Sequence, residues 1–187
     1  HAFDFGHSYM TAIFNAPDDP LSQAYFASLS SKVGEDRAKE ILGVNRHNTI
    51  IYPSCSPHTS FQQWRVIRPL SVDRTLVEIF TFRLDGAPEE LLQRTFKYSN
   101  VVNSPSSIVM TDDVHVYAEC QKGLATQGGD WVSQHRNAGQ DLPFSGADGG
   151  EIGVGTSELP IRNQFRAWRE YMTGDVTQTI PLQSSEL

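Results

Sequence analysis

Two alternating stretches separated by one short turn constrain the fold of this chain most. Residues 61–70 (FQQWRVIRPL) and 74–84 (RTLVEIFTFRL) interleave apolar with polar side chains, and a period of two is typical of a strand with one buried face. The PLSVD segment at their junction contains a proline and a turn aspartate, which favour a reversal of the chain. The two stretches therefore predict an antiparallel pair of strands.

Helical periodicity surrounds this pair. We expect helices at 20–43, at 87–102, from near 104–107 to about 124, and at 158–174, with a further short strand at 48–54. The Gly-, Asp- and Ser-rich segment 125–158 is expected to be loop, including the Gly-x-Gly of residues 146–155. Helices around antiparallel strands favour one α+β domain in which helices cover a sheet, and 187 residues suffice for its core.

The last of these helices predicts its own buried face. Its large apolar side chains recur at helical spacing on one side, and they are Ile161, Phe165, Trp168 and Tyr171 or Met172. Three arginines of the segment 162–170 fall elsewhere on the helix. We expect them to form a solvated face, with contact to a partner protein as the alternative.

Composition excludes two classes of partner. The chain has 15 Lys and Arg against 22 Asp and Glu, and no basic run, which argues against nucleic-acid binding. No apolar run approaches the roughly 20 residues that span a membrane. Cys55 and Cys120 make no disulfide framework, so free thiols in a reducing cytoplasm are expected. The first residue is His1, so we expect a processed chain or a piece of a longer one.

Two adjacent aspartates interrupt the apolar stretch VMTDDVHVYAEC, residues 109–120. On a helix the neighbours of a residue lie three and four positions away. Those of Asp113 are all largely apolar, namely Val109, Met110, Val116 and Tyr117, whereas Asp112 has His115 on one side. Asp113 is therefore expected on the inward face. A buried carboxylate must pair, be protonated or bind a metal, and an ion pair with an arginine, a water contact, a metal site and a catalytic role all remain open.

From His47 to Thr173 the chain resembles the catalytic domain of the α subunit of Rieske-type aromatic-ring-hydroxylating dioxygenases. The stretches that carry the resemblance are HNTIIYPSCS (47–56), LVEIFTFRLDGAPEELLQRTFKYSNVV (76–102), TDDVHVYAECQKGL (111–124) and IRNQFRAWREYM (161–172). It implies a helix-grip fold, of the Bet v 1 or START type. It also implies that residues 1–187 are one catalytic domain, the C-terminal portion of a longer α subunit whose Rieske domain lies outside this chain.

In that family two histidines and one aspartate hold a mononuclear Fe(II) and leave positions open for O₂. The resemblance assigns the aspartate to Asp113, and leaves Asp112 a structural role. His1 and His7 have a His-x5-His spacing, but the aspartate that the family places three residues earlier is missing. Both iron histidines are therefore expected upstream, as is the [2Fe–2S] cluster. The CSPH stretch, residues 55–58, supplies one ligand pair only, so we expect a buried Cys55 and a loop His58.

The resemblance also implies a substrate pocket and partners. The expected pocket residues are His47, Asn48, Ile50, Asn103, Ile108 and Val109, although ordinary core packing is an alternative for His47 and for each apolar position. A ferredoxin or reductase would deliver electrons, and O₂ would be inserted into an aromatic ring. The oligomer would be α3 or α3β3, in a bacterial cytoplasm.

Two alternatives from other classes stay open. The helix-grip fold also serves carriers that bind apolar small molecules without a metal, and such a carrier would hold Asp113 in a salt bridge. An assembly subunit of an oxygenase that has lost its iron is the other alternative.

Overall fold

The predicted hairpin is present in the structure, a computed structural model that describes residues 1–11, 19–44, 46–129, 131–145 and 149–174. Strands β4 (Gln63–Ser71) and β5 (Arg74–Thr81) pair antiparallel, in a register that runs from Gln63 opposite Thr81 to Ser71 opposite Arg74. Strand β3 (Cys55–His58) adds to the other side of β4. The alternating pattern therefore located the hairpin, whereas β3 was not expected.

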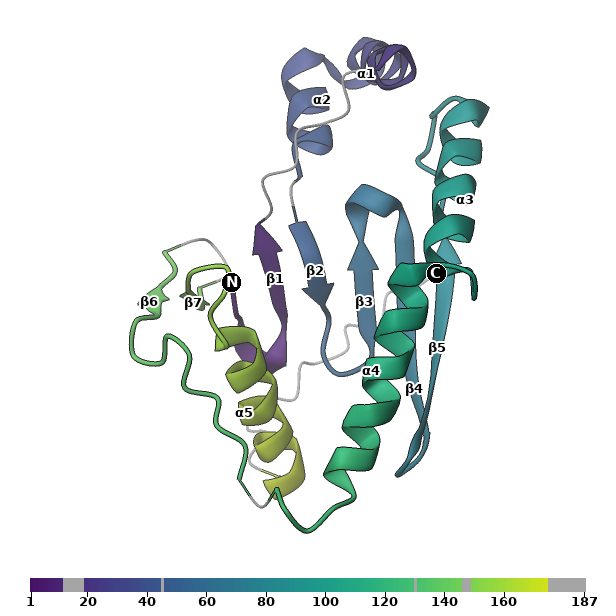
Figure 1. The fold of residues 1–187 in the computed structure, drawn as a ribbon. Coiled ribbons are helices and arrows are strands. Elements are labelled where there is room, and N and C mark those ends of the chain that lie inside the picture. Colours follow the sequence, from purple (N-terminus) through teal and green to yellow (C-terminus); the bar gives the residue numbers. More distant parts are fainter. Residues whose placement is uncertain (12–18, 45, 130, 146–148, 175–187) are drawn as a thin grey trace, which may run out of the picture.

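A second pair of strands extends this arrangement. Strand β1 (Ser8–Thr11) pairs antiparallel with β2 (Arg46–Ile50). A bridge between Ile51 and Cys55 joins β2 to β3, so that β1 to β5 lie side by side (Figure 1). The two-residue strands β6 (Leu142–Pro143) and β7 (Glu151–Ile152) pair with each other, and Glu151 also bridges to Ala2. Part of the expected loop is thus tied to the N-terminal segment.

Two helices, not one, precede β2. The expected helix over 20–43 is divided into α1 (Pro20–Val33) and α2 (Glu35–Leu42). Gly34 lies between them at φ 85°, a conformation that glycine adopts readily and that ends a right-handed helix. Asp19 caps α1, because its side chain accepts hydrogen bonds from the backbone amides of Leu21 and Ser22. Tyr25 of α1 forms a small core with Ala87 and Leu91.

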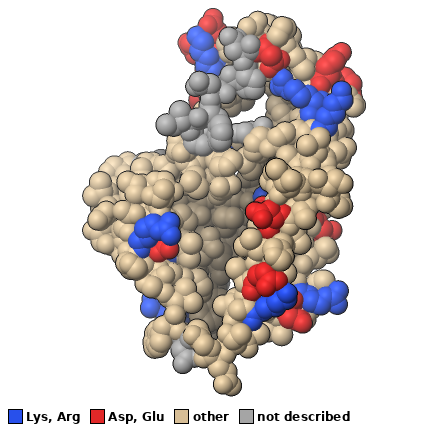
Figure 2. All heavy atoms as spheres, in the orientation of Figure 1, with Lys and Arg blue, Asp and Glu red and all other residues tan. Residues whose placement is uncertain are grey.

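The other predicted helices are present within a few residues of their expected ends. They are α3 (Glu89–Asn103), α4 (Ile108–Leu124) and α5 (Leu159–Thr173). Two 3₁₀ turns, η1 (Asp4–Gly6) and η2 (Thr59–Phe61), precede β1 and β4. Helices α4 and α5 lie on the same side of the strands (Figure 1), and Figure 2 shows the molecular surface hollowed between them. No helix in the described ranges has the length and apolarity to cross a bilayer.

The buried face of α5 is not the predicted one. Leu159, Asn163 and Ala167, spaced at four-residue intervals, are buried, and the Asn163 amide donates hydrogen bonds to the carbonyls of Phe3 and His7. The expected stripe is exposed instead, at Ile161, Phe165, Trp168, Tyr171 and Met172. Small and amide side chains are buried on this face because the N-terminal segment packs closely against it. A Cβ on Gly6 would lie 2.9 Å from the Cβ of Ala167.

Candidate functional site

Asp113 lies on α4, whose N-terminus is capped by the Ser107 hydroxyl accepting from the Val109 amide. The helix has no buried residue, and Asp113 itself is exposed. The burial that the sequence predicted for Asp113 therefore does not occur in the described chain. The apolar neighbours that suggested it are exposed too, with 52% of Val109 and 65% of Tyr117 accessible. The apolar stripe exists, but no described segment covers it.

The carboxylate of Asp113 is free to bind a ligand. Among the described residues it accepts no hydrogen bond and forms no ion pair, so the expected pairing with an arginine does not occur there. The described ranges also hold no group of three His, Cys, Asp or Glu side chains close enough together to bind a metal ion. One carboxylate suits one position of a three-ligand iron site, and the described residues bring no second or third ligand to it.

His1 and His7 are engaged far from α4. The Nδ1 atom of His7 accepts a hydrogen bond of 3.1 Å from the Tyr52 amide. The His1 ring stacks on the Tyr9 ring with centroids 4.5 Å apart, and its Nε2 lies 3.1 Å from the Thr11 hydroxyl. Both rings thus fasten the N-terminal strand.

Three of the expected pocket residues cluster where α3 meets α4. Asn103 ends α3 and donates through Nδ2 to the Ser99 hydroxyl at 3.1 Å, while its Oδ1 is buried without a partner. Ile108 and Val109 begin α4 and are exposed, Ile108 to 88%. These three side chains leave an amide oxygen and apolar surface available at the same end of the helix pair.

The other three expected pocket residues lie on β2 and are separated from one another. Asn48 is exposed at φ 44° and its Nδ2 lies 3.8 Å from the Met10 sulfur. Ile50 borders an open groove of about 350 Å³, lined by Phe3, Asp4, Phe5, His7, Ser8, Tyr9, Arg46, Thr49, Ile50 and Ile51. His47 instead packs edge-on against the His58 ring, with centroids 4.4 Å apart. The β2 residues therefore divide between two environments.

A ring cluster around His58 was missed by the sequence reading. His58 belongs to β3 and is 4% exposed, whereas Cys55 is only partly buried, so the expected roles of these two residues are reversed. The His58 ring packs on His47 and Phe61, and Phe61 stacks on Tyr98. Burial, with the nearby charges of His47 and Arg65, lowers the pKa of His58 to about 4. His58 is thus a neutral imidazole at neutral pH.

A chain of polar side chains runs from β4 to the end of α3. Gln63 is 1% exposed and donates through Nε2 to the Ser99 hydroxyl at 3.3 Å, the oxygen to which Asn103 also donates. Its Oε1 accepts a long bond of 3.4 Å from Arg65 Nη2. Thr81 donates to the same Ser99 oxygen. Buried polar atoms require such partners, yet Arg65 Nε and Asn103 Oδ1, at the two ends, are buried and have none.

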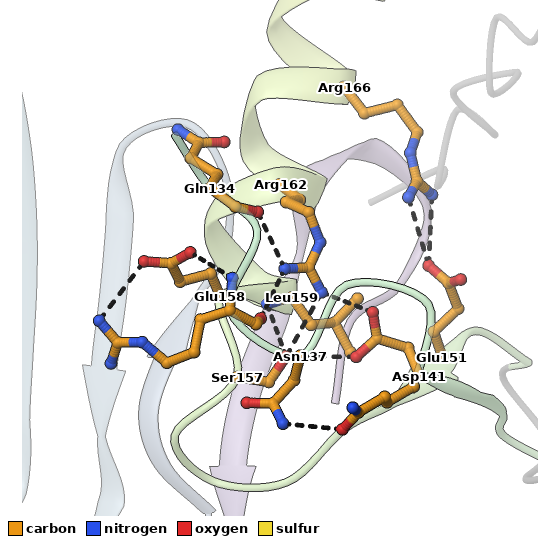
Figure 3. A network of polar contacts seen from close by, with 11 residues as sticks. Gln134, Asn137, Asp141, Glu151, Ser157, Glu158, Leu159, Arg162 and Arg166 are labelled. Atoms are coloured by element: carbon orange, nitrogen blue, oxygen red, sulfur yellow. Dashed lines mark hydrogen bonds and ion pairs between the residues drawn. The ribbon is translucent and has the colours of Figure 1, made fainter. Parts of the chain in front are cut away.

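On the opposite side of the molecule, Arg162 of α5 contacts residues of the segments 134–145 and 149–158 (Figure 3). Its Nη2 lies 2.5 Å from Asp141 Oδ2, and its Nη1 donates to the carbonyls of Gln134 and Arg136. The two charged side chains are 19% and 11% exposed. The prediction of a solvated arginine face is therefore wrong for Arg162. It is confirmed for Arg169, which is exposed, and for the half-exposed Arg166, which pairs with Glu151.

Comparison with proteins of known sequence identifies two relatives. The chain is 32% identical over 151 residues to the toluate 1,2-dioxygenase subunit alpha of Pseudomonas putida. The aligned region covers 79% of this chain and 32% of the relative. It is 28% identical over 139 residues to the 2-halobenzoate 1,2-dioxygenase large subunit of Burkholderia cepacia, with 74% and 30% covered. The chain thus spans about a third of the length of these relatives. No protein-family model matches it.

Solved structures share the fold. A phenanthrene-bound mutant of naphthalene 1,2-dioxygenase superposes with a TM-score of 0.69 at 19% identity, over 92% of this chain and 41% of the other. Naphthalene 1,2-dioxygenase with indole bound gives a TM-score of 0.65 at 19% identity, over 81% and 34%. These matches confirm the expected α+β architecture of helices on antiparallel strands. With the sequence relatives, they place the chain in the family of α subunits of Rieske-type aromatic-ring-hydroxylating dioxygenases.

Proposed function

We propose that this chain is the catalytic-domain portion of an oxygenase α subunit that inserts O₂ into an aromatic ring, with residues 1–187 forming a single domain. The observation that carries the proposal is the free carboxylate of Asp113, the second aspartate of a double-Asp helix in a chain related to two 1,2-dioxygenase subunits. The carrier alternative is disfavoured, since the salt bridge it requires at Asp113 does not form among the described residues.

Asp113 would supply one ligand to a mononuclear Fe(II). Its exposure and lack of a partner fit that role, and a carboxylate is the third donor of the two-histidine, one-carboxylate sites of such oxygenases. The iron, when bound, activates O₂ beside the substrate. In this proposal the two histidines and the [2Fe–2S] cluster come from the part of the α subunit that this chain does not include. His115, exposed on the same helix, is not needed as a ligand.

The substrate in this proposal is a benzoate-type aromatic acid. The two relatives are named for toluate and 2-halobenzoate, which are aromatic carboxylates. The proposed pocket residues are His47, Asn48, Ile50, Asn103, Ile108 and Val109. The buried, unpaired amide oxygen of Asn103 and the exposed apolar surface of Ile108 and Val109 support this proposal. The protein's task is to hold the ring in place and to exclude water.

The relatives are named as subunits, which supports a multicomponent enzyme. We propose an α3 or α3β3 oligomer, supplied with electrons by a ferredoxin or reductase in the bacterial cytoplasm. The exposed aromatic side chains of α5, Phe165 and Trp168, provide apolar surface for such contacts.

Replacement of Asp113 in the complete enzyme tests this function. Asp113→Ala removes a ligand, so mononuclear iron should be lost and turnover of an aromatic substrate should fall about a hundredfold or more, while the visible absorbance of the [2Fe–2S] cluster persists. Asp112→Ala is the matched control, one residue away on the same helix, and should have the milder effect. Undiminished turnover with full iron content in Asp113→Ala would contradict the assignment.

A further inference from the structure

Strand β4 carries two arginines in very different environments. Arg68 Nε lies 2.5 Å from Glu78 Oε2, so its charge is neutralised by the neighbouring strand. Arg65 forms no ion pair with any residue that the structure describes. Among those residues it makes one hydrogen bond, the long contact of 3.4 Å to Gln63. Its Nε–H is buried and has no acceptor. The same strand thus holds one compensated and one uncompensated guanidinium.

Strand register shows which face Arg65 shares. Gln63 lies opposite His58 of β3 and Thr81 of β5, and Arg65 lies opposite Ser56 and Ile79. Directly paired residues, and residues two apart on one strand, project from the same face of a sheet. Since the Gln63 side chain reaches Ser99 of α3, Arg65 projects from the face on which α3 packs, beside the ring cluster of His58, Phe61 and Tyr98.

An arginine in this position favours an anion. A partly buried guanidinium with an unsatisfied N–H carries a desolvation cost that a hydrogen-bond acceptor offsets, and a charged acceptor offsets it most strongly. Its charge already acts on its surroundings, since it contributes to the lowered pKa of His58. A planar guanidinium matches the two oxygens of a carboxylate in a fork-to-fork pair. The aromatic rings at Phe61 and Tyr98 offer an apolar surface next to it.

We propose that Arg65 binds the carboxylate of an aromatic acid substrate and so selects acids over neutral arenes. This role of Arg65 rests on the proposed function above, and it assigns the selection of the acid to one side chain. Asn103, at the other end of the Arg65–Gln63–Ser99 chain, keeps this group of side chains in place through Ser99.

The test compares benzoate with methyl benzoate, an uncharged compound of similar shape, as substrates of the complete oxygenase. In Arg65→Gln, KM for benzoate should rise about tenfold to a hundredfold, the range expected for a lost charge-assisted hydrogen bond. KM for methyl benzoate should stay the same or fall. Arg68→Gln, on the same strand but on the opposite face, should change neither value.

Equal losses for both compounds in Arg65→Gln would overturn the proposal, because the anion would then be a carboxylate of the protein itself. Unchanged kinetics would overturn it too. If Arg65→Gln does not fold, Arg65→Lys keeps the charge without the fork, and a rise in KM confined to benzoate supports the proposal, whereas no selective rise refutes it.

Equilibrium binding separates this proposal from the proposed function. Calorimetric titration of the parent enzyme with benzoate should show binding that Arg65→Gln weakens. An enzyme that turns over methyl benzoate yet binds no benzoate would refute the anchor and leave the oxygenase function standing. An enzyme that binds benzoate through Arg65 but oxidises no arene would refute the oxygenase function and leave the carboxylate contact of Arg65 standing.

Discussion

The α5 side of the molecule and the α3–α4 side differ in how their polar atoms are paired. On the α5 side, Arg162 contacts Asp141 and two backbone carbonyls (Figure 3). Asn163 donates to two further carbonyls. On the α3–α4 side, Asn103 Oδ1 and Arg65 Nε are buried without partners. Native proteins leave few buried polar atoms unpaired. The difference teaches that the polar contacts of the α5 side stabilise the fold. The buried polar atoms of the α3–α4 side still lack the hydrogen-bond partners that a ligand or another part of the protein would supply.

Breaking the Arg162–Asp141 pair should have the largest effect on stability. Arg162→Met leaves the Asp141 carboxylate buried without its cation, a change that costs about 3–5 kcal/mol. Arg166→Met is the control, since its pair with Glu151 is half exposed and such pairs contribute at most about 1 kcal/mol. Urea unfolding of both variants measures the difference. Similar losses in the two variants would remove the contrast between the two sides.

The helices and the hairpin could be predicted from sequence because each depends on local pattern. Alternation marked β4 and β5, and helical spacing marked α3, α4 and α5. The burial of side chains was not predictable in the same way. Which face of a helix is buried depends on what packs against it, and α5 uses Asn163 and Ala167 because the N-terminal turn η1 lies there. The apolar stripe of α4 predicted a burial that no described segment provides.

The ring cluster escaped prediction for a related reason. His58 lies on a strand of only four residues, too short for a periodic signal, and its neighbour His47 is 11 positions away in the chain. Only the pairing of β3 with β4 and the packing of η2 bring His58 against Phe61 and Tyr98. The Arg65–Gln63–Ser99 chain depends likewise on strand register.

The pH dependence of folding sharpens the comparison, because His58 belongs to the α3–α4 side and is buried. Its pKa is about 4 in the folded chain against 6.5 when unfolded, so below 6.5 the unfolded chain binds the extra proton. The free energy of unfolding should therefore fall as pH decreases from about 6.5 to 4, by roughly 3 kcal/mol at most.

Substitution separates His58 from the other titrating groups. His58→Gln should remove this part of the slope in unfolding free energy against pH. Denaturant titrations at several pH values between 4 and 7 provide the measurement. An unaltered slope in His58→Gln would show that folding does not lower the pKa of the His58 imidazole.

The smallest effect on this chain alone is expected at Tyr117, although it is a large aromatic residue. Because its side chain is 65% exposed on α4, Tyr117→Ser should change the unfolding free energy of this chain by no more than about 0.5 kcal/mol. Leu91→Ala, in the core with Tyr25 and Ala87, should cost about 2–5 kcal/mol by comparison. If the rest of an α subunit covers α4, the same Tyr117 substitution should cost about 2 kcal/mol there, and thermal unfolding of the complete subunit would detect it. An equally small change in both contexts would mean that α4 stays exposed, and that its apolar stripe has no structural partner.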